Sequence, residues 1–286
     1  MIEIMSGDNA TIMRELRERG SSFALAYLDP PFFSGAEYRT ADGEPAFDDR
    51  WPSRAEYMAR LREWVSAARD LLIPEGCLVL HLDPSASHYA KVMCDEVFGE
   101  QCFASEIIWR YRRWPAKTPN FQAMHDVLLR YVRDDRAIPR WNQLYEPLSD
   151  VTLEKWKGRR QKSSYVNGRR VTVREKTDGP TSIESSNGAP LSDVWDLKIL
   201  AQCHPERTGY PTQKPEALIA RLIDACTNEG DWVLDPFMGS GTTLAVCAKR
   251  GRNAVGIDAS PVALRYAEER LRPILAQRSL FAEVGS

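Results

Sequence analysis

A chain of 286 residues can bury one sizeable core, and its 43% apolar and 27% charged residues are ordinary for a globular protein. No run of about 18 apolar residues could span a membrane, and the N-terminus lacks signal-peptide features, so we expect a cytoplasmic protein. The six cysteines include no Cys-x-x-Cys pair and the four histidines show no ligand spacing, which argues against a metal site.

The first elements predict an α/β sheet. Residues 2–5 form a short strand, and Asp8 can cap the helix that follows. The apolar run 23–28 predicts a buried parallel strand, which ends at Asp29-Pro30-Pro31-Phe32. Neither proline can donate an N–H to a neighbouring strand, so the chain leaves the sheet where such sheets bind ligands. A carboxylate beside a fixed carbonyl can accept both hydrogens of an amino group, although the same residues could form a plain turn.

The middle of the chain continues this alternation. Residues 33–50 show no periodicity, so we expect a loop that is either mobile beside a site or disordered on the surface. A capping box at Ser53 then opens a series of helices and strands near 54–72, 77–82, 85–98, 104–111 and 127–132. The last two strands are expected to pair antiparallel at the sheet edge. His81 is predicted to be a packed or surface histidine.

Residues 140–205 break the pattern and carry a local positive charge. Nine Lys/Arg and two acidic residues give the stretch 154–176 a net charge of +7, whereas the whole chain has −2. Such a one-sided block indicates a polyanion site, although a solvated charged face would look similar. Asn167-Gly168 favours a hairpin over 163–173. The basic and aromatic stretch 110–114 is a second candidate for contact with a phosphate backbone.

The α/β pattern resumes at Tyr210 and includes a glycine loop. The strand at 232–235 is followed by glycines that let backbone N–H groups approach a ligand closely. Asp235 could pair with a ligand ammonium. The strand at 253–257 ends at Asp258, where a carboxylate could bind ribose hydroxyls. Ser260 and Pro261 are expected to start a last helix that reaches about Leu271.

Together, the Asp-Pro-Pro-Phe stretch and the later glycine loop resemble the DNA amino-methyltransferases that use S-adenosylmethionine (SAM). The order of the two motifs is similar to that of the permuted β group, and the resemblance covers nearly the whole chain. It implies SAM as cofactor, double-stranded DNA as partner, no metal, and transfer to the N6 amino group of an adenine flipped out of the duplex. Within this family an N4-cytosine enzyme usually has Ser where this chain has Asp29. The resemblance leaves open a homodimer and a cognate restriction endonuclease.

The resemblance also assigns roles to residues. The catalytic turn is Asp29, Pro30, Pro31 and Phe32, and the cofactor residues are Asp8, Asp29, Thr212, Lys214, Asp235, Pro236, Phe237, Gly239, Ser240, Gly241, Thr242 and Asp258. For Asp8, Thr212 and Lys214, simple capping remains an alternative. The DNA-contacting candidates are Arg112, Arg113, Arg169, Arg170 and Arg174.

The fold expected is a doubly wound, mostly parallel seven-stranded α/β sheet, circularly permuted and with an antiparallel last strand. Residues 1–139 and 206–286 are expected to form the catalytic core, and 140–205 a small target-recognition insert. An N4-cytosine enzyme, an RNA amino-methyltransferase and an inactive DNA-binding module remain alternatives. The chain has no Pro-Cys nucleophile, no Gly-Lys-Ser/Thr loop, and Leu244 instead of the third glycine of a dinucleotide loop.

Overall fold

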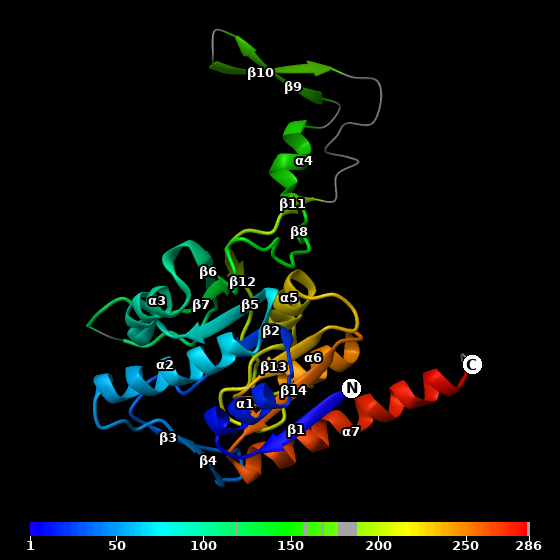
Figure 1. Cartoon of the computed structure of the whole chain (residues 1–286). Coiled ribbons are helices and arrows are strands. Elements are labelled where there is room, and N and C mark those ends of the chain that lie inside the picture. Colours follow the sequence, from blue (N-terminus) through cyan, green and yellow to red (C-terminus); the bar gives the residue numbers. More distant parts are fainter. Residues whose placement is uncertain (118, 157–158, 167–168, 177–187, 285–286) are drawn as a thin grey trace. The chain divides into compact units, whose positions relative to one another are not determined.

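Figure 1 shows the computed structural model of the chain, which describes residues 1–117, 119–156, 159–166, 169–176 and 188–284. By its internal contacts the chain divides into two compact units. The first, the core unit, comprises Met1–Asn142 and Asp193–Ser286, and the second, the insert unit, comprises Gln143–Ser192. The insert unit is therefore narrower than the interval 140–205 expected from composition.

The core unit is built on one eight-stranded sheet with the order β1-β14-β13-β2-β5-β7-β6-β12. Neighbouring strands are parallel except that β7 is antiparallel to both β5 and β6. The mostly parallel sheet and the antiparallel pairing of β6 with β7 are thus confirmed, although the expected place at the sheet edge is taken by β12. The strands are β1 (Ile2–Ser6), β2 (Phe23–Leu28), β5 (Leu72–Leu82), β6 (Phe103–Arg110), β7 (His125–Val132), β12 (Val194–Asp196), β13 (Trp232–Asp235) and β14 (Asn253–Asp258).

Helices cover both faces of this sheet (Figure 1). Helices α1, α2 and α3 pack on one another, as do α5, α6 and α7. Every residue of β2 is buried, as expected for a strand between two helical layers. The helices are α1 (Asn9–Glu18), α2 (Arg54–Asp70), α3 (Pro84–Phe98), the 3₁₀ turn η1 (Glu100–Cys102), α5 (Glu216–Cys226), α6 (Thr242–Lys249) and α7 (Pro261–Val284). Among the described residues, none of the helices has the length and apolar character that crossing a membrane requires.

Strand β12 was not predicted, and it corrects the expected count of seven strands. It is only three residues long, so periodicity gives little signal, but it pairs in parallel with β6 at the sheet edge. Trp195 is buried there, and the indole of Trp109 donates a hydrogen bond to the Leu197 carbonyl at 2.9 Å. These contacts place the residues after 192 in the core unit.

Two further expectations were wrong. Residues 33–50 are not an irregular loop, because β3 (Glu37–Arg39) and β4 (Pro45–Asp48) form an antiparallel hairpin. The last helix continues through Pro273 to Val284 and does not end near Leu271. A proline inside a helix removes one backbone hydrogen bond, and α7 tolerates that change and continues beyond it.

The insert unit has small elements of its own. It contains β8 (Tyr145–Glu146) paired with β11 (Ala189–Pro190), the helix α4 (Asp150–Trp156), and the hairpin of β9 (Arg159–Val166) with β10 (Arg169–Lys176). Arg169 pairs with Val166, so the predicted hairpin is confirmed in its register. The predicted turn residues 167–168 lie outside the described residues.

The insert unit is bounded by two residues that are fixed to the core unit. The Asn142 backbone N–H donates to the Ala225 carbonyl at 2.7 Å, and its side chain donates to the Asp224 and Thr227 carbonyls. On the other side, the Asp193 carbonyl accepts a hydrogen bond of 2.8 Å from the N–H of Ile108. Both ends of the insert are thereby set by backbone contacts within the core unit.

Candidate active site

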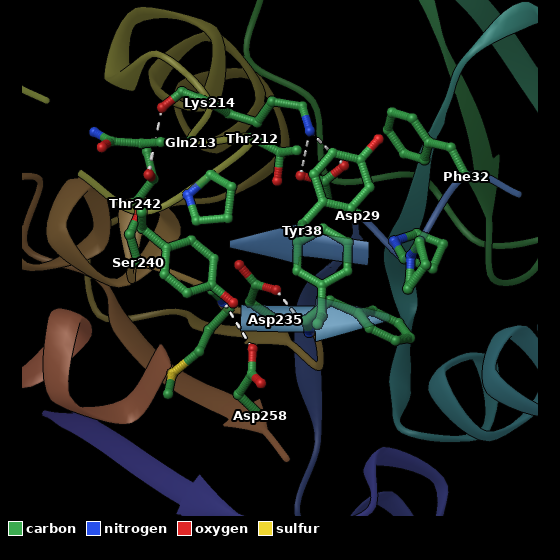
Figure 2. A pocket seen from close by; sticks show the side chains of 18 of the residues that line it. Asp29, Phe32, Tyr38, Thr212, Gln213, Lys214, Asp235, Ser240, Thr242 and Asp258 are labelled. Atoms are coloured by element: carbon green, nitrogen blue, oxygen red, sulfur yellow. Dashed lines mark hydrogen bonds and ion pairs between the residues drawn. The ribbon is translucent and has the colours of Figure 1, made fainter. Parts of the chain in front are cut away.

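A cavity of about 300 Å³ lies where β2, β13 and β14 end, all inside the core unit (Figure 2). Because these three strands are parallel neighbours, their carboxyl ends bring segments from opposite ends of the sequence together. The predicted residues that line the cavity are Asp29, Pro30, Pro31, Phe32, Thr212, Lys214, Asp235, Phe237, Gly239, Ser240, Thr242 and Asp258. The two motifs of the sequence therefore face one cavity.

The strands on either side of the glycine loop give this cavity a buried carboxylate, Asp235, and a half-buried one, Asp258. Asp235 is 2% exposed and accepts the Phe237 N–H at 3.0 Å, and burial raises the pKa of its carboxyl to about 7. Asp258 accepts the backbone N–H groups of Gly239 and Ser260, and burial also raises its pKa. Asp29 adds a third carboxylate at the end of β2, and such a set favours a cationic ligand.

The loop itself depends on glycine at two positions. Gly239 has φ 48° and Gly241 has φ 72°, both in the left-handed region that glycine adopts without cost. A Cβ atom on Gly239 would lie 3.2 Å from the Tyr210 ring, and one on Gly241 would lie 2.9 Å from the Ala267 Cβ. Gly241 and Pro236 thus shape the loop without lining the cavity.

Asp29 pairs with Lys214, which comes from the other half of the chain. The Lys214 ammonium lies 2.7 and 2.6 Å from the two carboxylate oxygens of Asp29 and 4.9 Å from the centre of the Phe32 ring (Figure 2). Thr212, in the same segment, has φ 55°, which a β-branched side chain rarely adopts. Strain of this kind is typical of segments that shape a ligand site.

Asp49 fixes the catalytic turn, and sequence reasoning missed it. Its carboxylate is 1% exposed and accepts the backbone N–H groups of Phe32, Phe33 and Ser34 at 2.7–3.1 Å, as well as the indole N–H of Trp51. Nothing in the aperiodic stretch 33–50 marks this residue, because its partners are defined only by the folded turn.

The hairpin that leads to Asp49 also gives the cavity an aromatic wall. The rings of Tyr38 and Phe47 stack with centres 4.6 Å apart, and both line the cavity. An aromatic wall beside carboxylates suits a flat heterocycle that carries polar groups. This wall was also missed, since both rings come from the stretch expected to be a loop.

The structure does not place Asp8 in the cavity. Its side chain caps α1 by accepting the Thr11 N–H at 3.0 Å and forms an ion pair with Arg60. The next residue, Asn9, lines the cavity instead and donates a side-chain hydrogen bond to the Pro236 carbonyl. The structure thus shows the capping role that the sequence left open for Asp8, and a contact between Asp8 and the cofactor stays a prediction.

Of the predicted DNA-contacting residues, Arg112 and Arg113 belong to the core unit, and neither lines the cavity. Arg112 is exposed, and Arg113 donates to the Tyr111 hydroxyl at 2.9 Å. Arg169, Arg170 and Arg174 lie on strand β10, and their side chains are outside the described residues. In the part of the chain that the structure describes, no cluster of three or more His, Cys, Asp or Glu could hold a metal ion.

Fold and cavity together define a class. A glycine loop between two acidic residues that shares one cavity with an Asp-Pro-Pro-Phe turn, at one edge of an open α/β sheet, is the arrangement of the amino-methyltransferases that the sequence resembles. A family model described as DNA methylase (N6_N4_Mtase) matches residues 23–269, and the chain belongs to this family.

Curated relatives agree with this assignment. The chain is 30% identical to the Type II methyltransferase M.HpaI of Haemophilus parainfluenzae, over 88% of this chain and 68% of that protein. It is 26% identical to the DNA adenine methyltransferase YhdJ of Escherichia coli (strain K12), over 98% of this chain and 92% of that protein.

Solved structures show the same fold at low sequence identity. The M1.HpyAVI–SAM complex has a TM-score of 0.60 and 22% identity, and the match covers 95% of this chain and 99% of that chain. PvuII DNA methyltransferase, which is cytosine-N4-specific, has a TM-score of 0.59 and 15% identity, with 94% and 86% covered. Because an N4-specific enzyme shares the fold, the fold alone does not select the target base.

Proposed function

We propose that this chain transfers a methyl group from SAM to the N6 amino group of adenine in DNA. The observation that carries the proposal is the single cavity shared by the Asp29–Phe32 turn and the acid-lined glycine loop. The relatives named as a Type II methyltransferase and a DNA adenine methyltransferase support both the reaction and the base. The order of the two motifs along the chain supports the permuted β-group arrangement.

The residues around the glycine loop fit SAM. SAM supplies an activated methyl group on a sulfonium and also carries an ammonium, and both charges match the carboxylates that line the cavity. Asp235 would pair with the ammonium and Asp258 with ribose hydroxyls, while Thr212 and Lys214 would lie near the carboxylate of SAM. The open backbone at Gly239 would let the loop contact the ligand closely.

On the other side of the cavity, Asp29 and the Pro30 carbonyl would accept the two hydrogens of the target amino group. These hydrogen bonds favour a pyramidal nitrogen whose lone pair is available, and the remaining contribution is alignment and electrostatics. Phe32 would stack on the adenine, which must be flipped out of the duplex to reach this depth. Asp49 keeps Phe32 in place by holding three backbone N–H groups of the turn.

We infer that the insert within 140–205 and the 110–114 segment contact DNA. The charge of +7 over residues 154–176 and the exposure of Arg112 support this. Arg169, Arg170 and Arg174 would contact phosphates from the β9–β10 hairpin. Since several relatives are named Type II methyltransferases, we also propose that a restriction endonuclease with the same target accompanies the chain.

The decisive experiment expresses the chain in cells that lack DNA methylation and sequences their DNA with a methylation-sensitive method. We expect N6-methyladenine at one short sequence motif, and none with the Asp29→Ala variant. N4-methylcytosine would overturn the choice of base and leave the methyltransferase assignment intact. Methylated RNA with unmethylated DNA would favour the RNA enzyme, and no methylation of either would favour the inactive module.

A further inference from the structure

A buried chain of polar side chains lies behind Asp29. The imidazole of His81 is fully buried, and its Nδ1 lies 2.8 Å from the Tyr27 hydroxyl and 3.8 Å from an Asp29 oxygen. Its Nε2 lies 3.2 Å from one oxygen of Asp126, and the other oxygen accepts the Tyr111 hydroxyl at 2.7 Å. Nothing in the mechanism above uses these groups.

The sheet register places His81 directly behind the catalytic turn. Leu28, the last residue of β2, is paired with Leu80 of β5. Asp29 and His81 are the next residues along the two segments. The His81 ring also lies 5.6 Å from the Phe32 ring, centre to centre. One buried histidine therefore lies beside both residues that would bind the target base.

The hydrogen bonds indicate which nitrogen of His81 carries the proton. Although burial alone would raise the pKa of the Asp126 carboxyl, interactions with His81, Lys214 and Tyr111 hold that pKa below its ordinary value, which favours the ionised carboxylate. An ionised Asp126 takes the N–H of Nε2, and in a neutral ring Nδ1 is then the acceptor for the Tyr27 hydroxyl. Tyr27 itself lines the cavity beside Asp29.

These buried polar side chains are not required for the stability of the fold, because apolar side chains could fill the same space without burying a charge. Without His81, the Tyr27 hydroxyl would be a free donor at the wall of the cavity that holds Asp29. It could then donate to the Asp29 carboxylate, which already accepts the Lys214 ammonium, and fewer lone pairs would remain for the substrate amino group.

We propose that His81 is a positioning residue for methyl transfer, which keeps the hydroxyl hydrogen of Tyr27 away from Asp29 and supports the Phe32 ring from behind. This inference rests on the proposed function of the Asp29 turn. Asp126 holds the ring in the required tautomer, and Tyr111 holds Asp126.

The test is His81→Phe, whose ring keeps the place beside Phe32 but offers no acceptor to Tyr27. We expect kcat for DNA methylation to fall about tenfold, because a change of about this size corresponds to one competing hydrogen bond. The KM values for DNA and for SAM should stay nearly unchanged. Tyr27→Phe alone should lower kcat less than His81→Phe does. The double variant should recover most of the activity lost in His81→Phe, because no hydroxyl remains to compete.

Tyr131→Phe is the matched control. Its hydroxyl donates to Asp95 at 2.6 Å from strand β7, which also carries Asp126, so the variant loses a hydrogen bond away from the cavity. It should lower the melting temperature without lowering kcat. An unchanged kcat in His81→Phe, or no recovery in the double variant, would overturn the proposal.

A second measurement does not depend on activity. The side-chain ¹⁵N–¹H spectrum contains the signals of only four histidines. The signals that are lost in His81→Phe are those of His81. We expect a protonated Nε2 and an acceptor Nδ1 whose shifts change in Tyr27→Phe and in Asp126→Asn. If the chemical shifts of His81 are the same in both variants as in the wild-type protein, the inference about His81 is wrong. If the wild-type protein methylates nothing, the proposed function alone is wrong.

Discussion

The cavity and the insert unit place their functional groups in opposite ways. In the cavity, residues as distant in sequence as Asp29 and Lys214 come within 2.7 Å of one another, because parallel strands end at a common edge. In the insert, the basic residues follow one another along a hairpin and need only a local turn. The proposed methyl transfer requires that residues from distant parts of the chain meet in one cavity. The proposed contact with DNA requires only a high local density of positive charge. Variants in the two regions should therefore separate methyl transfer from DNA affinity.

The largest effect is expected from Asp29→Ala. Loss of one transition-state contact of this kind costs about 10² to 10³ in rate, and loss of the charge adds to it. Tritium transfer from labelled SAM to DNA measures the rate, and nucleoside analysis identifies the product. DNA affinity should stay near the wild-type value, and Asp29→Asn should retain part of the activity because it keeps an acceptor. Near-normal N6-methyladenine from Asp29→Ala would contradict the mechanism.

Asp235 should make SAM binding depend on pH. Because the pKa of its carboxyl is about 7, the ionised form that pairs with an ammonium disappears as the pH falls below that value. SAM affinity should then weaken by up to about tenfold per pH unit. Asp235→Asn should bind more weakly at high pH and show little of this dependence. Calorimetry at about pH 6 and about pH 8 makes the comparison, and an equal slope in both proteins would assign the pH effect to another group.

Neutralising the hairpin should act on DNA alone. Arg169→Gln with Arg170→Gln should flatten the dependence of log affinity on log salt concentration by about one unit for each phosphate that the variant no longer binds. Catalysis at saturating DNA and SAM affinity should be unaffected. Arg112→Gln is the comparison in the core unit. If only Arg112→Gln changes the salt slope, the insert does not bind the phosphates.

The smallest effect is expected at Thr212, whose backbone has φ 55°. Thr212→Gly should relieve this strain and raise the free energy of unfolding by up to about 1 kcal/mol, while it loosens the segment that leads to Lys214. Thr212→Val keeps the β-branched side chain and serves as the control without a gain. Denaturant unfolding measures both variants. A loss of stability in Thr212→Gly would mean that the Thr212 side chain contributes more than its backbone strain costs.

Sequence reasoning recovered what local patterns encode. Seven strands, the turn at Asp29 and the glycine loop after Asp235 were found because strands show apolar runs and because prolines and glycines mark where the chain leaves them. Asp49 and the pairing of His81 with Asp126 were missed, since a buried acid or histidine is marked only by partners far away in sequence. For Asp8 the sequence left capping and cofactor binding open, because the two kinds of aspartate look alike, and the structure shows the capping contact.

The way in which the insert unit joins the core unit has a consequence for the target-recognition role that the resemblance implies for it. Asn142 and Asp193 are held by backbone hydrogen bonds to Ala225 and Ile108, which do not depend on the side chains between them. Replacement of residues 143–192 by a different segment would keep these junctions, and none of the residues that line the cavity would be exchanged. If the insert unit recognises the target, a new target preference could then arise by exchange of this one segment, while the residues of the proposed chemistry stay the same.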